Sequence, residues 1–356
     1  MADDTRAALR AEPVTSAAAL AMTYVLPLRS GSDDLDDLPA YLGLISGVVE
    51  QIVVVDGSGP GPRRAHEAAL RGIAEVCAPQ NITRMGKVGG VLTGLEAARH
   101  EHVVIADDDV RYEPDQLVCL DALLAQAEVV RPQNYFSPLP WHSRFESARI
   151  VLNRVAGGDW PGTLAVRRSV ILSAGGYAGD ALFENLELVR TVRAAGGREL
   201  LALDLLVRRL PPTAAHFLSQ QVREAYDEFA RPVRLVASLA LLPGVALAAR
   251  RGARPVATVA ACAVALAELG RRRCGGAERF DMTASLLAPM WLIWRSLCTW
   301  MALGSWLRGG VRYDGERLPR AATSMRELRR RHVQRAGSRA DSLKQVETVH
   351  GHRPKC

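Results

Sequence analysis

The chain has 356 residues, of which 48% are hydrophobic and 23% charged, and a formal net charge of +7 at pH 7. This balance is typical of a globular protein that buries a core, and the length predicts about two domains. The six cysteines include no C-x-x-C pair, which excludes a cysteine-rich zinc site and a disulfide framework and makes a reducing compartment the simplest expectation. Basic residues gather after Leu307, and a basic tail favours anionic partners such as acidic lipid or nucleic acid.

The first hundred residues alternate apolar strand-like stretches with helical stretches. We expect strands over Met22–Leu28, Ile52–Val55 and Ile73–Ala78, and helices up to about Glu50 and over Pro62–Arg71 and Lys87–His100. This alternation predicts a doubly wound α/β domain, in which ligands bind at the carboxyl ends of the strands. No G-x-G-x-x-G motif follows the first strand, so a dehydrogenase is poorly supported.

A buried strand over Val103–Ala106 is followed by three consecutive carboxylates, Asp107, Asp108 and Asp109. In an extended chain Asp107 and Asp109 point the same way. Three acids at one strand end repel one another, and a divalent cation such as Mg²⁺ or Mn²⁺ would offset that repulsion. The alternative is an Asp-rich turn that caps the next helix.

Three segments, in this order, resemble the nucleotide-sugar half of a family 2 glycosyltransferase of the GT-A fold: Val53–Ser58, Gly86-Lys87 with Gly90 and Gly94, and Ala106–Asp109. The resemblance implies a Rossmann-like mixed α/β sheet. It also implies that Asp56 contacts the nucleobase, that Lys87 lies near the nucleotide, and that Asp107 and Asp109 hold Mg²⁺ or Mn²⁺ on the diphosphate. Such a cation neutralises the charge that develops on the leaving nucleoside diphosphate.

The loop before the strand Leu164–Val166 resembles the glycine-rich acceptor-side loop of that family, which assigns Trp160, Gly162 and Thr163 to the acceptor side. Trp160 is either a stacking platform for a sugar or lipid, or part of the core.

The segment Phe183–Leu188 resembles the family's E-D-x-E/D-L stretch, in which the Asp of the E-D pair is the general base. Asn185 stands at that position, and an amide cannot accept a proton as a carboxylate does. We therefore expect Glu184 or Glu187 to be the base, since both lie on one face of a helix at its start. Either carboxylate could instead be present only because the first turn of a helix stabilises a negative charge. A catalytically impaired sugar-nucleotide-binding protein is the alternative.

Gln220–Arg223 resembles the Q-x-x-R part of the Q-x-x-R-W motif of membrane-bound members, with Glu224 in place of the tryptophan. The polysaccharide synthases of the family carry the intact motif, so the missing tryptophan argues against polymer synthesis. Arg223 is predicted to contact phosphate, although Q-x-x-R on a helix is also frequent by chance.

Three apolar stretches follow, over Leu235–Ala249, Val256–Leu269 and Met282–Leu307. The first two are shorter than the ~20 residues that span a bilayer, and the third contains Arg295. Both joins between them are basic, which does not fit a simple up-and-down span. We expect helices in the membrane interface or a re-entrant hairpin, with spanning by the third stretch and a soluble helical subdomain as alternatives.

The chain is thus divided into an N-terminal extension (1–21), a GT-A domain (22–231), a membrane-associating helical region (232–308), a basic segment (309–339) and a tail expected to be disordered (340–356). Within the basic segment, Gly309–Tyr313 is expected to fold back as a strand or lid over the nucleotide site. The expected reaction is inverting transfer from a nucleotide-diphosphate sugar, most simply a UDP-sugar, to a hydroxyl of a lipid or membrane-linked acceptor. The catalytic domain is expected on the cytoplasmic face of the cell membrane, the side on which the positive-inside rule places the basic joins. No signal peptide is expected at Met1–Thr15. Nucleic-acid binding by the basic tail is a rival reading that lacks a motif.

Overall fold

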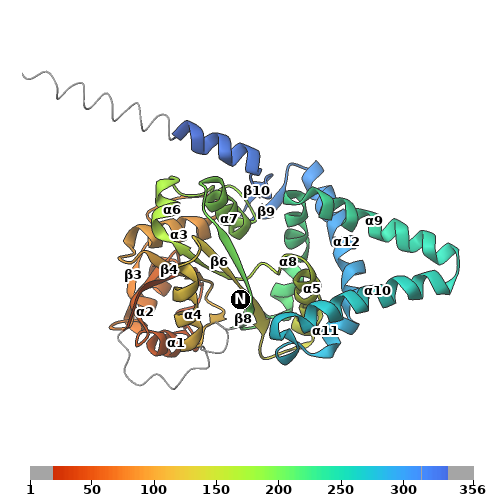
Figure 1. The fold of residues 1–356 in the computed structure, drawn as a ribbon. Helices are drawn as coiled ribbons and strands as arrows, with labels where there is room; N and C mark the ends of the chain where they lie inside the picture. Colours follow the sequence, from red (N-terminus) through yellow and green to blue (C-terminus); the bar gives the residue numbers. More distant parts are fainter. Residues whose placement is uncertain (1–18, 314, 336–356) are drawn as a thin grey trace, which may run out of the picture.

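A computed structural model describes residues 19–313 and 315–335 of the chain; the expected disordered tail and most of the expected N-terminal extension lie outside the described residues. Its centre is an eight-stranded sheet with the order β3-β2-β1-β4-β7-β6-β8-β5 (Figure 1). The strands of this sheet are β1 (Leu20–Leu28), β2 (Val49–Asp56), β3 (Glu75–Cys77), β4 (His102–Ala106), β5 (Val110–Arg111), β6 (Val129–Phe136), β7 (Thr163–Arg167) and β8 (Glu199–Arg209).

Strand direction divides the sheet into two halves. Strands β3, β2, β1 and β4 run parallel to one another. Strand β7 is antiparallel to both β4 and β6, β6 is parallel to β8, and β5 is antiparallel to β8 at the edge. The sheet is therefore mixed, which confirms the predicted α/β class.

Helices cover both faces of the sheet (Figure 1). In the first part of the chain they are α1 (Leu38–Ile45), α2 (Pro60–Ala69), α3 (Gly86–Ala97), α4 (Pro114–Leu124), α5 (Trp141–Val155), α6 (Arg168–Ser173), α7 (Glu184–Ala194) and α8 (Ala214–Tyr226), the last followed by the 3₁₀ turn η2 (Asp227–Ala230). Successive residues of one strand enter different cores: Val25 packs on one face, and Tyr24 and Leu26 on the other. Burial on both faces explains why the strands are continuous apolar stretches.

Two sequence predictions were wrong in this region. The helix expected to reach about Glu50 ends at Ile45. The residues from Val49 onward belong to β2 instead, since Val49 pairs with Leu20 of β1. The long strand β8 was not predicted. It pairs with β6 across a register shift, and its pattern of buried and exposed residues is too irregular to predict from alternation.

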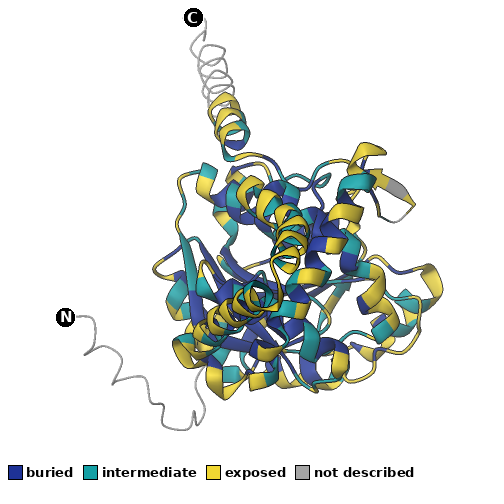
Figure 2. Cartoon of the chain, turned by 90° about the vertical axis from the view of Figure 1, so that its right-hand side faces the viewer, coloured by how far each residue is buried: buried dark blue, intermediate teal, exposed yellow. Residues whose placement is uncertain are grey.

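The C-terminal helices are α9 (Pro232–Arg250), α10 (Ala253–Arg272), α11 (Met282–Leu286) and α12 (Ala288–Leu307), with the turn η3 (Arg273–Glu278) after α10. Helices α9 and α10 form a hairpin that extends away from the sheet (Figure 1), and Figure 2, in which this side faces the viewer, shows them largely exposed. The prediction that the first two apolar stretches are too short is wrong. Within the described residues, α9 and the segment Ala253–Glu278 are long and apolar enough to cross a membrane, by length and composition only.

The third apolar stretch behaves differently. Helix α12 packs against α5, α8, α9 and α10. Its Arg295 is buried and lies 3.3 Å from a carboxylate oxygen of the fully buried Glu228. A short antiparallel pair follows, β9 (Val311–Tyr313) and β10 (Glu316–Leu318), and residues 325–335 form a further helix.

Candidate functional site

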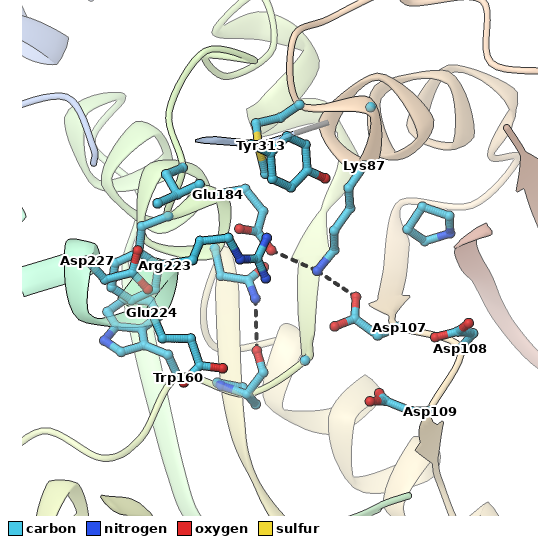
Figure 3. A pocket seen from close by; sticks show the side chains of 18 of the residues that line it. Lys87, Asp107, Asp108, Asp109, Trp160, Glu184, Arg223, Glu224, Asp227 and Tyr313 are labelled. Carbon is cyan, nitrogen blue, oxygen red and sulfur yellow. Dashed lines mark hydrogen bonds and ion pairs between the residues drawn. The ribbon is translucent and has the colours of Figure 1, made fainter. Parts of the chain in front are cut away.

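A polar cleft of about 570 Å³ opens at the carboxyl ends of β1, β2 and β4, where ligands bind in parallel α/β sheets. Its walls come from the sheet, from α3, α7 and α8, and from β9 (Figure 3). Charged residues predominate among the side chains that face it, including Lys87, Asp107, Asp108, Asp109, Glu184, Arg209, Arg223, Glu224, Asp227 and Arg231.

Lys87 joins the two sides of this cleft. Its Nζ lies 2.5 Å from Oδ1 of Asp107 and 2.8 Å from Oε1 of Glu184 (Figure 3). Burial lowers the pKa of Lys87, but the two carboxylates outweigh it and raise the pKa above its ordinary value. Two glycines of α3 set the position of this lysine: a Cβ at Gly94 would overlap Val25 of β1, and one at Gly90 would lie 3.1 Å from Pro27. Lys87 is therefore a fixed cation at the strand ends.

The three aspartates after β4 face the same cleft. Arg209 of β8 donates from Nε to Oδ2 of Asp109 at 2.9 Å, and its Nη2 lies 3.7 Å from Oδ2 of Asp107. Desolvation and the charges of Asp109 and Asp107 raise the pKa of Asp108. This acidic cluster favours a cation, and Lys87 and Arg209 already supply two positive charges to it.

The aspartates also fit a divalent cation. Oδ1 of Asp109 is buried and has no hydrogen-bond partner in the described part of the chain. Carboxylate oxygens are the ligands that Mg²⁺ and Mn²⁺ prefer, and Mg²⁺ keeps several waters and uses substrate phosphates as well. Among the described residues no group of three or more His, Cys, Asp or Glu forms a complete ligand set.

Asp56 does not face the cleft as expected. Its side chain is fully buried, with Oδ2 2.7 Å from Nδ1 of His66 and Oδ1 accepting the backbone N–H of Ser58 at 2.8 Å. Its neighbours Val55 and Gly57 line the cleft instead. In this arrangement the Asp56 carboxylate shapes the loop after β2, and its contact with a nucleobase stays a prediction.

The acceptor-side loop divides in the same way. Gly162 lines the cleft, and its carbonyl accepts the backbone N–H of Asp107 at 2.9 Å. A Cβ at this position would lie 2.7 Å from Oδ2 of Asp107, so only glycine allows this close approach. Thr163 does not line the cleft: it is buried and donates to the carbonyl of Ile105 at 2.7 Å, and its predicted place on the acceptor side stays a prediction.

Trp160 combines the two alternatives left open for it. It lines the cleft and packs against the main core. The guanidinium of Arg131 lies 4.2 Å from its ring centroid, and Phe183 meets it edge-on at 5.1 Å. One face of the ring is therefore occupied by the protein itself.

The two candidate bases differ sharply. Glu184 lines the cleft beside Lys87. Glu187 is fully buried outside it, and its Oε2 accepts the backbone N–H of Thr323 at 2.6 Å, so of the two predicted bases only Glu184 lines the cleft among the described residues. Asn185 also lines the cleft and donates from Nδ2 to the carbonyl of Pro161 at 2.8 Å, which ties α7 to the acceptor-side loop.

Asp227, at the end of α8, is a cleft residue that was not predicted. Desolvation raises its pKa to about 8, with smaller raising contributions from Glu184 and Glu224, and Arg295 and Arg231 oppose the shift. Perturbed carboxyls of this kind gather at functional sites. The sequence signal was weak, since Asp227 differs from other helix-end acids only in its apolar neighbours Ala225, Tyr226 and Phe229.

Arg223 lines the cleft, and its guanidinium lies 5.5 Å from the ring centroid of Tyr313; its contact with phosphate stays a prediction. Tyr313 belongs to β9 and lines the same cleft, so the prediction that Gly309–Tyr313 folds back as a strand at this site is confirmed.

No protein-family model matches the sequence, and no curated protein sequence matches it. Among solved structures, the mannosyltransferase PcManGT from Pyrobaculum calidifontis, in complex with GDP-Man and Mn²⁺, matches at 19% identity over 79% of this chain and 87% of its own, with a TM-score of 0.49. Glucosyl-3-phosphoglycerate synthase from Mycobacterium tuberculosis, in complex with Mn²⁺, UDP and phosphoglyceric acid, matches at 18% identity over 56% and 73%, with a TM-score of 0.38. TarS 1–349 from S. aureus, in complex with UDP-GlcNAc, matches at 12% identity over 56% and 60%, with a TM-score of 0.38. At these scores the likeness carries no argument about the chemistry of this chain, which depends on its own cleft.

Proposed function

We propose that the protein is a glycosyltransferase that moves a sugar from a nucleotide-diphosphate sugar, most simply a UDP-sugar, to a hydroxyl of a lipid or membrane-linked acceptor. The observation that carries this proposal is the contact of Lys87 with both Asp107 and Glu184 in a cleft at the strand ends. This contact supports the proposal because a cation suited to a diphosphate, acids suited to a metal ion and a candidate base would then share one site.

In this proposal Asp107 and Asp109 hold Mg²⁺ or Mn²⁺. When bound, the metal ion neutralises charge on the diphosphate. Lys87 and Arg209 lie beside these acids and would contact the phosphate oxygens as fixed cations. Because the protein holds these groups before the donor binds, they need little rearrangement as charge develops on the leaving group.

Glu184 is the proposed base. Its carboxylate accepts the proton of the acceptor hydroxyl while the acceptor oxygen bonds to the anomeric carbon and the bond to the diphosphate breaks. One direct displacement of this kind inverts the anomeric carbon. Asp227 is the second candidate base, since it lies in the same cleft and its pKa of about 8 matches a proton acceptor near neutral pH.

The α9–α10 hairpin supports the membrane-linked acceptor. No residue of α9 is buried, and apolar side chains such as Val233 (84% exposed) and Val236 (66%) face outward. Exposed apolar surfaces of this extent mark interaction sites. Arg250, Arg251 and Arg254 are exposed at the hairpin tip and are costly inside hydrocarbon, so we propose that the hairpin lies in the interface on the cytoplasmic face or crosses completely.

The test is release of nucleoside diphosphate by the purified full chain, measured with UDP-glucose, UDP-GlcNAc and GDP-mannose in the presence of Mn²⁺. Metal-dependent release that is lost in Asp107→Asn supports the transferase. Asn185 favours a second function, a sugar-nucleotide-binding protein, and donor binding without any turnover would support it. Absence of both binding and release would overturn both functions.

A further inference from the structure

A second cavity adjoins the cleft on the side of β9. It also has a volume of about 570 Å³ and shares Arg29, Arg223 and Tyr313 with the cleft. Its other walls come from α8, from the end of α12 and from the β9–β10 pair, including Ser305 and Val311. It thus lies where the catalytic domain meets the last apolar helix.

Five arginines line this cavity: Arg29, Arg223, Arg308, Arg312 and Arg317. No carboxylate lines it among the described side chains. Within that same part of the chain, Arg223, Arg308, Arg312 and Arg317 form no ion pair. We refer to this cavity as the arginine pocket.

The hydrogen bonds of Arg308 and Arg317 go to backbone carbonyls and leave the charge of these two arginines in place. Arg317 donates from Nη1 to the carbonyls of Arg308 at 2.9 Å and Gly310 at 3.1 Å, and Arg308 donates to the carbonyl of Gly304 at 3.5 Å. A carbonyl accepts a hydrogen bond but carries no net charge. Like charges that converge in a concavity repel one another, and a multiply charged anion relieves that repulsion.

We propose that the arginine pocket binds a phosphate or diphosphate group carried by the acceptor. This inference rests on the proposed transfer reaction and adds the chemical class of its acceptor. Guanidinium groups form paired hydrogen bonds with phosphate oxygens, and several of them around one cavity select a doubly charged group over a neutral one.

The position of the pocket separates this group from the diphosphate of the donor. The acids proposed to hold the metal ion, Asp107 and Asp109, line only the cleft, whereas Arg308, Arg312 and Arg317 line only the arginine pocket. Arg223 and Tyr313 lie between the two cavities. An acceptor whose phosphate occupies the pocket would extend past Tyr313 toward Glu184. Trp306 and Leu307, which lie between the lining residues Ser305 and Arg308 in the sequence, are exposed apolar side chains at the end of α12.

The test is calorimetric titration of the full chain with inorganic pyrophosphate in EDTA, which removes metal-dependent binding at Asp107 and Asp109. The pocket variant is Arg308→Gln with Arg312→Gln. The matched control is Arg329→Gln with Arg330→Gln, which removes the same charge from exposed positions outside the pocket. We expect the pocket variant to bind pyrophosphate at least about tenfold more weakly than wild type and the control to bind it normally.

Equal affinity in all three proteins, or no binding by wild type, would overturn the proposal. Stabilisation by a nucleotide sugar with Mn²⁺ is measured on the same proteins and should persist in the pocket variant, so failure of the pocket and failure of the transferase are distinguished. Vesicles of phosphatidylcholine with phosphatidic acid are then added as a competitor. Competition assigns the bound group to a lipid headgroup, and its absence assigns it to a soluble phosphorylated acceptor.

Discussion

Lys87 and Glu184 stand 97 positions apart in the sequence, and their side chains form a hydrogen bond of 2.8 Å across the cleft. The same ammonium lies 2.5 Å from Asp107. A phosphate oxygen that enters this site competes with two carboxylates for one cation, so donor binding would release Glu184 from Lys87 and leave it free to accept a proton.

Replacing Lys87 tests this arrangement. Lys87→Met removes the ammonium that contacts both Asp107 and Glu184, and we expect kcat/KM for the donor to fall about 10²-fold or more, as for loss of one preorganised charge donor. Lys87→Arg retains the charge and should recover part of the activity. Steady-state kinetics with varied donor checks both values, and unchanged kcat/KM in Lys87→Met would contradict the assigned role.

The identity of the base is tested by a pair of variants. Glu184→Gln should lower kcat by about 10²-fold to 10⁴-fold, because an amide cannot take the hydroxyl proton. Asp227→Asn should retain kcat within about tenfold. A larger loss is expected only for the residue that acts as the base, because a positioned acid–base group contributes more than about tenfold. The reverse pattern, with activity in wild type that rises as pH passes through 8, would reassign the base to Asp227.

Asp227 also makes a prediction about stability. Its pKa in the folded protein is about 8, above the ordinary value of 3.8, so the folded state binds more protons than the unfolded state between these pH values. The free energy of unfolding that depends on this group is therefore fully present below pH 3.8 and is lost as pH rises through 8. Asp227→Asn removes this loss. Its melting temperature relative to wild type should rise from pH 5 to pH 9, and parallel curves would contradict the assigned pKa.

Glu228 connects the hairpin to the catalytic domain. It is fully buried, with Arg234 of α9 at 3.1 Å, Arg295 of α12 at 3.3 Å and Arg231 at 3.4 Å. Burial raises its pKa, but these guanidiniums outweigh burial and lower it below the ordinary value. Glu228→Gln should lower the free energy of unfolding by about 3 kcal/mol, because buried cations lose their partner. Denaturant unfolding measures this, with Glu67→Gln on the surface as the control; equal losses would contradict the role of Glu228.

Gly162 tests how closely the acceptor-side loop must approach Asp107. A Cβ in Gly162→Ala would press on the Asp107 carboxylate and on Arg209, so donor binding should weaken by about tenfold while the fold is retained. Gly61→Ala is the control, because open space surrounds that position. Equal donor affinity in both variants would show that the close approach at Gly162 is unimportant.

The residues that could be predicted from the sequence are those whose position follows from a local pattern. Such positions lie next to the terminus of a strand or at the start of a helix, where backbone geometry decides what a side chain faces. They include Lys87, Asp107, Asp109 and Gly162. Asp56 has the same local pattern, but its carboxylate forms a hydrogen bond with His66 of the following helix, α2.

Other site features depended on distant segments. Glu187 accepts a hydrogen bond from the backbone of Thr323, 136 residues away, and the pKa of Asp227 is raised mainly by desolvation, with smaller contributions from Glu184 and Glu224. The arginine pocket combines Arg29, which follows β1, with residues of α8 and with residues between 305 and 317. None of these contacts leaves a periodic or motif signal, so sequence reasoning had no means of finding them.

The most direct test of the account is the Mn²⁺ dependence of donor binding, measured as the shift in melting temperature of the full chain with nucleotide sugars. A ligand that binds only the folded state raises this temperature. The account predicts a shift for at least one nucleotide sugar with Mn²⁺, a much smaller shift in EDTA, and loss of the Mn²⁺ effect in Asp109→Asn. An equal shift with and without Mn²⁺, unchanged in Asp109→Asn, would contradict it.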